Sequence, residues 1–263
     1  MNFNMLFYFS ATGNSLFAAR TISDQIGEDY VSMVDCIEDE RFRFAFSKDE
    51  RVGFVFPCYF WGLPPIVKSF VENLSTSDFE GRHLFLVMTC GSVIGSALGD
   101  AVRYFKANGI HVSAAYRLLM PENYVIVFKA PSDKQLRRRL NHSAAILTRI
   151  ITDVHESRTN HHPTMLSRIM ILPSRVFHAY YQKHRSTRPF SVSDRCIGCG
   201  LCARICPTHS IAMLDEKPEW HGDCLQCLGC LNRCPTAAID YGRMTQKRGR
   251  YVHPDGFAEH STH

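Results

Sequence analysis

The chain has 263 residues, of which 45% are hydrophobic and 21% charged, and its formal net charge at pH 7 is +5. This composition excludes a disordered chain and is sufficient for one or two domains with a buried core. Because no apolar run reaches the roughly 18 to 20 residues of a membrane helix, and because the first residues lack the cationic start of a secretory signal, we expect a cytoplasmic protein.

Residues 3–120 alternate short apolar runs with longer amphipathic stretches. This pattern is typical of βα units, and it predicts a three-layer α/β domain with a parallel sheet and a ligand at the carboxyl ends of its strands. Strands are predicted at 5–9, 29–34, 51–57, 83–89 and 111–119, and helices at 14–26, 64–74 and 93–107.

The loop after the first predicted strand combines hydroxyl groups, one glycine and the start of a helix in Ser10, Ala11, Thr12, Gly13, Asn14 and Ser15. Free amides at a helix start attract anions, so this loop suits a phosphate monoester. It has no lysine, which excludes a nucleoside-triphosphate loop, and its lone glycine argues against a dinucleotide fingerprint. The alternative is an ordinary βα turn with a helix cap.

This hexapeptide and its setting resemble the FMN phosphate loop of flavodoxins, over roughly residues 1–150. The resemblance implies an FMN site completed by two later loops at strand ends. The candidates are Pro57, Cys58, Tyr59, Phe60, Trp61 and Gly62 after the third strand, and Thr89, Cys90, Gly91 and Gly95 after the fourth. The alternative for the second loop is aromatic core packing.

The match to flavodoxins has departures. The third loop lacks the aromatic and acidic residues that those proteins often place there, so the groups that cover the flavin faces stay open, with Tyr124 as a candidate. Cys58 and Cys90 are either buried thiols, the commoner case, or reactive groups.

The segment from Pro131 to Pro189 is basic, with eleven Lys and Arg residues against three Asp and Glu. Its helical periodicity predicts a helical bridge that packs against the rest of the chain, with a flexible point near residues 159–163. An amphipathic membrane-surface helix at 165–185 is the alternative.

Eight of the eleven cysteines form two runs of the same pattern, C-x2-C-x2-C-x3-C followed by proline. The runs are Cys196, Cys199, Cys202 and Cys206, and Cys224, Cys227, Cys230 and Cys234. Zinc favours separate pairs of cysteines and has no use for this spacing. The repeat resembles the bacterial-type ferredoxins with two [4Fe-4S] clusters, which implies that the fourth cysteine of each run binds the cluster of the other run.

The chain as a whole resembles the flavodoxin-ferredoxin fusion proteins of anaerobes. Its predicted parts are a flavodoxin-like domain at 1–150, a helical basic bridge at 151–189, a small α+β ferredoxin domain at 190–243 and a polar surface tail at 244–263. The resemblance implies single-electron transfer between two [4Fe-4S] clusters and FMN. The alternative is an FMN-dependent reductase of a small organic acceptor. No nicotinamide site is recognisable, so the expected partner is a redox protein such as a ferredoxin, a flavodoxin or an oxidoreductase. We expect neither a nucleic acid nor a membrane as partner, and the sequence leaves the oligomeric state open.

Overall fold

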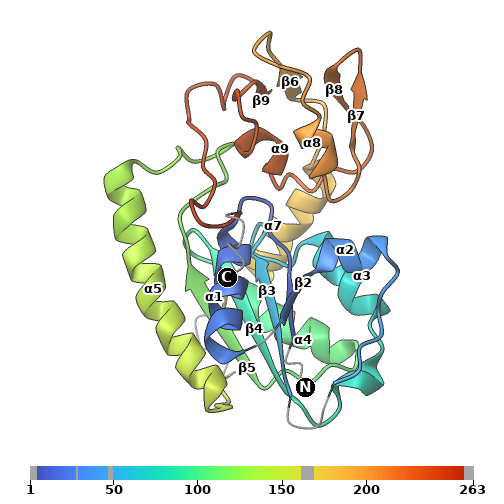
Figure 1. Cartoon of the computed structure of the whole chain (residues 1–263), viewed down its shortest axis with the longest axis vertical. Helices are drawn as coiled ribbons and strands as arrows, with labels where there is room; N and C mark the ends of the chain where they lie inside the picture. The colour runs from blue at the N-terminus through green and yellow to red at the C-terminus, as the bar shows by residue number, and fades with distance from the viewer. Residues whose placement is uncertain (1–4, 28, 47–49, 161–168, 258–263) are drawn as a thin grey trace.

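The computed structural model describes residues 5–27, 29–46, 50–160 and 169–257 (Figure 1). Its larger part is built on a five-stranded parallel sheet with the order β2-β1-β3-β4-β5. This is the strand order of a flavodoxin-like sheet, so the predicted fold class is confirmed. The strands are β1 (Met5–Tyr8), β2 (Asp29–Ser32), β3 (Arg51–Pro57), β4 (His83–Cys90) and β5 (Ala114–Leu119).

Helices cover both faces of this sheet (Figure 1). One face packs against α1 (Asn14–Ile26) and α5 (Asp133–His155). The other packs against α2 (Met33–Glu38), α3 (Pro65–Asn73) and α4 (Ala97–Ala107), with a short 3-10 helix η1 (Thr76–Phe79) at its margin. Successive strand residues alternate between the two cores, as the period-2 pattern predicts: Leu6 belongs to one and Phe7 to the other.

The elements differ from the predicted ones mainly at their ends. The second strand stops at Ser32 because this side chain accepts hydrogen bonds from the backbone of Val34 and Asp35 and so caps α2, a helix that the sequence analysis missed. The fifth strand begins at Ala114 instead of residue 111, and α5 extends past the predicted boundary at 150 to His155.

The basic segment after the sheet does not form one continuous bridge. Its first helix, α5, is part of the three-layer domain, since Leu147, Ile150 and Val154 lie in the core beneath the sheet. Its second helix, α7 (Ile171–His184), leads to the cysteine-rich unit. Most of the predicted flexible point and the start of the alternative membrane-surface helix lie outside the described residues.

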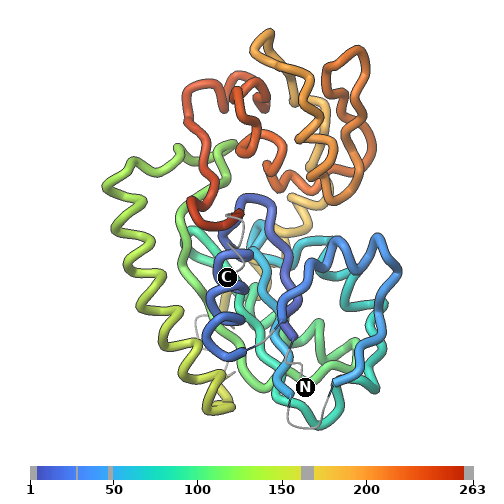
Figure 2. Tube along the Cα trace, viewed as in Figure 1, coloured from blue at the N-terminus to red at the C-terminus, as the bar shows by residue number. Residues whose placement is uncertain are grey.

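The cysteine-rich unit stands above the sheet's carboxyl edge (Figures 1 and 2). Strands β6 (Phe190–Val192) and β9 (Ile239–Tyr241) pair antiparallel, as do β7 (Ile211–Leu214) and β8 (Lys217–Trp220). The short helices α8 (Leu201–Arg204) and α9 (Gly229–Asn232) occupy equivalent places in the two halves of the repeat. Along the described residues, no helix is long and apolar enough to cross a membrane.

The polar C-terminal segment is not the surface tail that the sequence predicts. Residues 244–257, here called the strap, run back from the cysteine-rich unit to the first loop of the sheet (Figure 2). Thr245, Tyr251 and His253 are buried, with exposed fractions of 0%, 4% and 1%. Polarity alone is a poor guide here, because Thr245 and Tyr251 are hydrogen-bonded in the structure and the His253 ring stacks on Phe17.

Candidate functional site

A cavity of about 300 Å³, here called the loop cavity, opens at the carboxyl end of the sheet. All three predicted loops line it, because the carboxyl ends of parallel strands meet at one edge. The predicted residues in its wall are Ser10, Thr12, Asn14, Ser15, Pro57, Cys58, Tyr59, Phe60, Trp61, Thr89, Cys90 and Gly91. The predicted residues Gly13, Gly62 and Gly95 do not line it; a Cβ atom on Gly62 would meet His178, and one on Gly95 would meet Ser174.

The first loop presents helix-start amides to the cavity. Helix α1 begins at Asn14, so the first N–H groups of this helix have no helical partner. Gly13 precedes it with a φ of 94°, a conformation that a side chain would strain. The Ser15 hydroxyl lies 2.8 Å from that of Thr89, which joins the first loop to the third. The first loop therefore offers amides and hydroxyls and carries no charged side chain of its own.

The second loop is a tight turn in which the backbones of Tyr59 and Gly62 exchange two hydrogen bonds of 3.0 Å. Phe60 and Trp61, at its tip, have φ values of 48° and 57°. Such values cost energy for any residue with a side chain, so the surrounding packing must hold them. Part of that packing is the ring of Tyr181, which stacks on Phe60 at a centroid distance of 4.5 Å.

The third loop meets an acidic residue that sequence reasoning did not place there. Glu122, from the connection after β5, lies so close above Gly91 that a Cβ atom on this glycine would collide with its carboxylate. Backbone N–H groups of Asn123 and Tyr124 donate to that carboxylate at 3.1 Å. The acidic group that the third loop itself lacks is thus supplied from another segment.

Other wall residues come from segments far from the three loops. Tyr124, which the sequence named as a candidate, lines the loop cavity, as do Val127 and Phe128 of the same connection. Phe177 reaches it from α7, and Gln226 and Cys227 from the cysteine-rich unit. Nothing in the sequence of α7 distinguishes Phe177 from its apolar neighbours Val176 and Tyr180, so sequence reasoning could not have identified it.

Burial holds the thiols of Cys58 and Cys90 in their protonated form. It raises the pKa of Cys58 far above the ordinary range and that of Cys90 to about 12. A nucleophile must be a thiolate, so these shifts favour the inert of the two alternatives for Cys58 and Cys90.

The eight repeat cysteines lie around two further cavities. Cys196, Cys199, Cys202 and Cys234 line one, here called the outer cavity. Cys206, Cys224, Cys227 and Cys230 line the other, here called the inner cavity. The fourth cysteine of each run has therefore crossed to the cavity of the other run.

The shape of these cavities fits a cluster better than a single ion. Within the described ranges, no three His, Cys, Asp or Glu side chains converge closely enough to hold one metal ion. Four thiols around an apolar hollow instead leave room for a polynuclear group. Backbone N–H groups point at sulfur in both halves of the repeat, from Ser210 to Cys206 and from Ala238 to Cys234, each at 3.3 Å. Such bonds stabilise a ligated thiolate.

The inner cavity adjoins the loop cavity, since Cys227 lines both. Next to it, Gln226 accepts a hydrogen bond from the Tyr124 hydroxyl at 3.2 Å and donates to the Tyr241 hydroxyl at 2.7 Å. The Tyr181 hydroxyl donates to the Leu225 carbonyl at 2.6 Å. The two cavities are thus joined by the chain at Cys227 and by hydrogen bonds of the residues beside it.

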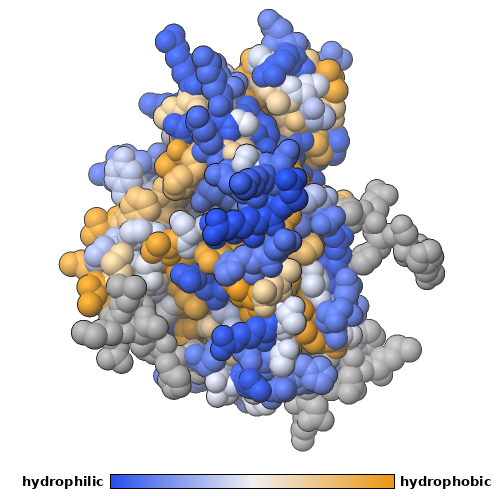
Figure 3. All heavy atoms as spheres, turned by 90° about the vertical axis from the view of Figure 1, so that its left-hand side faces the viewer, coloured by the Kyte–Doolittle hydropathy of each residue, from blue (hydrophilic) through white to orange (hydrophobic). Residues whose placement is uncertain are grey.

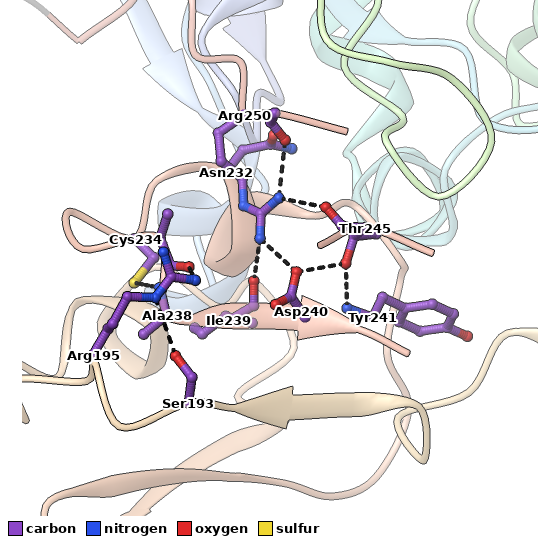
Figure 4. A network of polar contacts seen from close by, with 12 residues as sticks. Ser193, Arg195, Asn232, Cys234, Ala238, Ile239, Asp240, Tyr241, Thr245 and Arg250 are labelled. Carbon is purple, nitrogen blue, oxygen red and sulfur yellow. Dashed lines mark hydrogen bonds and ion pairs between the residues drawn. The ribbon is translucent and has the colours of Figure 1, made fainter. Parts of the chain in front are cut away.

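The strap begins in a polar network against β9 (Figure 4). The Arg250 guanidinium donates to the Asp240 carboxylate and to the Ile239 carbonyl, both at 2.7 Å, and to the Thr245 carbonyl at 3.0 Å. The Thr245 hydroxyl donates to the same carboxylate at 2.9 Å and accepts from the Tyr241 backbone at 2.7 Å. This network fixes the direction in which the strap leaves the cysteine-rich unit.

Asn232, on α9 between two repeat cysteines, ties that unit to the first loop by two routes. Its amide donates to the Asn123 carbonyl at 3.2 Å, and the Asn123 side chain donates to the Thr12 hydroxyl at 2.5 Å. The side-chain oxygen of Asn232 accepts from the backbone N–H of Tyr251 at 3.0 Å, and the Tyr251 hydroxyl donates to the side-chain oxygen of Asn14 at 2.9 Å. The first loop is therefore held by the cysteine-rich unit as well as by its own sheet.

Comparison with known families agrees with both halves. The model of a flavodoxin domain matches residues 5–93, and that of a 4Fe-4S dicluster domain matches residues 195–238. A search of the curated proteins finds no match.

Similar solved structures include three bacterial proteins. The two-electron reduced Megasphaera elsdenii flavodoxin is 16% identical, with a TM-score of 0.33 over 43% of this chain and 83% of its own. The Trp repressor binding protein of Bacillus subtilis is 13% identical, with a TM-score of 0.37 over 54% and 96%. The rubredoxin oxygen:oxidoreductase of Desulfovibrio gigas is 15% identical, with a TM-score of 0.35 over 58% and 36%.

Proposed function

We propose that the chain holds FMN in the loop cavity and a [4Fe-4S] cluster in each four-cysteine cavity. The proposal starts from its two domains, an N-terminal flavodoxin domain and a C-terminal 4Fe-4S dicluster domain, which make it a flavin and iron-sulfur electron-transfer protein. When bound, FMN exchanges one or two electrons and each cluster exchanges one. The proposed function is conversion between single-electron and two-electron transfer.

The observation that carries this proposal is the shared position of Cys227. As a ligand in the inner cavity and a wall residue of the loop cavity, it brings the inner centre against the flavin site. The outer cavity is more accessible, since Cys199 is exposed and the Ile197 side chain keeps 66% of its surface exposed. The order from surface to interior is thus outer cavity, inner cavity, loop cavity.

The chain's own residues prepare each site. In the loop cavity, the first loop would hold the FMN phosphate by amides and hydroxyls, while Tyr59, Phe60 and Trp61 would exclude water from the ring. In the inner cavity, Leu225 and Leu228 are buried, with exposed fractions of 3% and 1%, and keep water from the sulfur ligands. A dry site favours electron exchange with a fixed neighbour over exchange with solvent oxidants.

The proposal is tested by anaerobic purification followed by iron, sulfide and flavin analysis and a redox titration. The expected composition is about eight irons for two four-iron clusters and one FMN per chain. About four irons after careful reconstitution would contradict the second cluster, and full iron content without FMN would contradict the flavin site.

A second candidate function is the reduction of a small organic acceptor, such as a quinone or a nitro compound, by FMN. It is favoured by the rim of the loop cavity, where Val93, Val127 and Phe128 expose 63%, 56% and 47% of their surfaces. Exposed apolar groups around a cavity are typical of a ligand entrance. Anaerobic turnover of a quinone well above the rate of free FMN would favour this candidate, and turnover equal to that background would exclude it.

We also propose a redox protein as the physiological partner, on the basis of the chain's positive charge and of the missing nicotinamide fingerprint. A charged partner should associate at a rate that falls as salt increases. Salt-independent transfer from reduced ferredoxin would contradict an electrostatic contact.

A further inference from the structure

A further hollow, here called the basic groove, lies between α3, α4 and α7 and has a volume of about 800 Å³. It is distinct from the three cavities described above, although Trp61 lines both the basic groove and the loop cavity. Neither the flavodoxin match nor the dicluster match includes α7. The basic groove therefore depends on how these elements are assembled in this chain.

Positive charge dominates the wall of the basic groove. Lys68 comes from α3, Arg103 from α4, and Arg175 and Lys183 from α7, whereas Asp100 supplies the one carboxylate among the described lining residues. That carboxylate is already bonded to Arg103 at 2.5 Å. Within the described part of the chain, Lys68, Arg175 and Lys183 form no ion pair. Lys68 lies over the Tyr104 ring at 5.5 Å, but none of the three has a carboxylate partner there, and three such cations around one hollow attract an anionic group.

The basic groove is coupled to the loop that would cover the flavin. The Trp61 ring stands between groove and loop cavity, and His178 of the groove wall contacts the Tyr59 carbonyl through Nδ1 at 3.0 Å. Burial lowers the pKa of His178, with a further contribution from Lys68, so the ring is neutral near pH 7. An object seated in the groove would be one indole ring away from the flavin site.

Apolar side chains border the basic groove on α7. Leu172, Val176 and Tyr180 are exposed by 71%, 63% and 60%, and Phe177 next to them is exposed by 40% and touches Trp61 at a ring-centroid distance of 5.0 Å. An apolar patch beside a charged margin is the arrangement of a protein-protein contact surface. A small free anion would have no use for these side chains.

Charge elsewhere on the molecule does not gather at a redox site in the same way. Helix α5 is also basic, but it packs on the opposite face of the sheet from α3 and α4, where a largely hydrophilic surface faces the viewer in Figure 3. The cysteine-rich segment 190–243 has five Lys and Arg residues against six Asp and Glu. Single arginines do lie beside the cysteine cavities, since Arg204 donates to the Cys199 carbonyl and Arg185 to the Cys224 carbonyl, but acidic residues of the same segment outnumber the basic ones.

We propose that the basic groove, with the apolar face of α7, docks an acidic one-electron carrier protein beside the flavin. This inference rests on the proposed function and names the class of partner. In each encounter, the carrier gives up one electron and the flavin gains one, so no bond is made or broken.

The test uses the holoprotein and an acidic two-cluster ferredoxin as probe. The groove variant is Arg175→Glu with Lys183→Glu, both exposed residues, and the matched control is Arg137→Glu with Arg138→Glu on α5, also exposed. The two variants change the net charge by the same amount. Binding is measured by calorimetry at low and at moderate salt, and electron transfer by stopped-flow absorbance.

The groove variant should bind the ferredoxin at least about tenfold more weakly than the wild type at low salt and should lose most of its salt dependence, whereas the control variant should stay close to the wild type. Equal weakening in both variants would reduce the effect to net charge and overturn the assignment to the groove.

Two further measurements separate the possible failures. Reduction by the viologen radical, a small cation, should reduce the flavin in all three proteins. If the viologen reduces the flavin and the groove variant binds ferredoxin as the wild type does, the docking inference is wrong and the proposed function stands. If the viologen does not reduce the flavin of the wild type, the proposed function itself is contradicted. The three proteins are also sedimented with phosphatidylserine vesicles. If the wild type and the control variant sediment with the vesicles and the groove variant does not, the basic groove binds a membrane surface and the inference is overturned.

Discussion

Mild acid should release the strap from the first loop, because the strap is held down by a buried neutral histidine. The His253 ring is 1% exposed and stacks on Phe17 at a centroid distance of 4.1 Å. Its Nδ1 accepts from the Asp255 backbone at 3.2 Å, and its Nε2 has no hydrogen-bond partner within the described structure. Burial lowers the pKa of His253 from 6.5 to about 4, against a partial compensation by the Asp255 carboxylate.

The sign and the size of the effect follow from this shift. A histidine whose pKa is depressed in the docked strap stabilises docking fully above pH 6.5, progressively less as the pH falls below that value, and no longer below about 4. At pH 5 the loss is about 2 kcal/mol, which corresponds to a roughly 30-fold smaller docking equilibrium constant than at pH 8.

Hydrogen exchange of the His253 amide measures this equilibrium, since that N–H donates to the Thr12 carbonyl at 2.9 Å in the docked strap. After correction for the intrinsic pH dependence of exchange, protection should fall by roughly 30-fold between pH 8 and pH 5. His253→Gln should remove most of this dependence, and His142→Gln, at an exposed position on α5, should preserve it. The same pH dependence in His253→Gln as in the wild type would refute the reasoning.

Four substitutions test other parts of the structure. Cys206→Ser should disturb the signal of the inner cluster in electron paramagnetic resonance and interrupt electron flow to FMN, whereas Cys234→Ser should disturb the outer cluster; the opposite pattern would contradict the crossed ligand sets. Tyr251→Phe removes the hydroxyl that donates to Asn14, so a loss of about 1 kcal/mol should weaken FMN binding roughly fivefold by fluorescence titration, and unchanged affinity would show that the strap does not support the phosphate loop. Gly53→Ala would place a methyl group against side chains of both neighbouring strands. The free energy of unfolding, measured by urea titration, should therefore fall by about 1 to 3 kcal/mol, and wild-type stability would show that these strands can move apart.

Much of the site was predictable because it follows from local patterns. A strand, a loop of hydroxyls with one glycine and a helix follow one another within the first 26 residues, and in the structure this helix spans Asn14–Ile26 as predicted. Parallel strands then bring the loops after β1, β3 and β4 to one edge without further information. The sequence also showed that the third loop lacks an acidic residue, but it did not show that Glu122 supplies one from another segment.

Glu122 shows why the remainder could not be predicted. It follows β5 by only a few residues, but its position above Gly91 depends on how the next connection folds back, and no periodicity encodes that path. The same holds for Phe177, whose contact with Trp61 joins segments more than one hundred residues apart in the sequence. Contacts of this kind depend on the packing of whole elements.

The strap is the clearest error of the sequence-based interpretation, and its cause is physical. Hydropathy measures the average cost of burying a side chain, but a polar group is buried without that cost when it is hydrogen-bonded. Thr245 meets Asp240 and the Tyr241 backbone, and Tyr251 meets Asn14, so both are buried although the segment is polar. The partners of Thr245 lie within five residues, but Tyr251 and Asn14 are 237 positions apart, and such a pair cannot be matched from one sequence.

The sequence by itself therefore determined the two kinds of domain, the three loops and the cysteine spacing, because each depends on short stretches of chain with a fixed period. Only the tertiary structure decided that Cys227 borders the loop cavity, that the strap closes over the first loop and that the basic groove forms beside Trp61. These features depend on the placement of one domain on the other, which is set by side chains that meet across long separations in the chain.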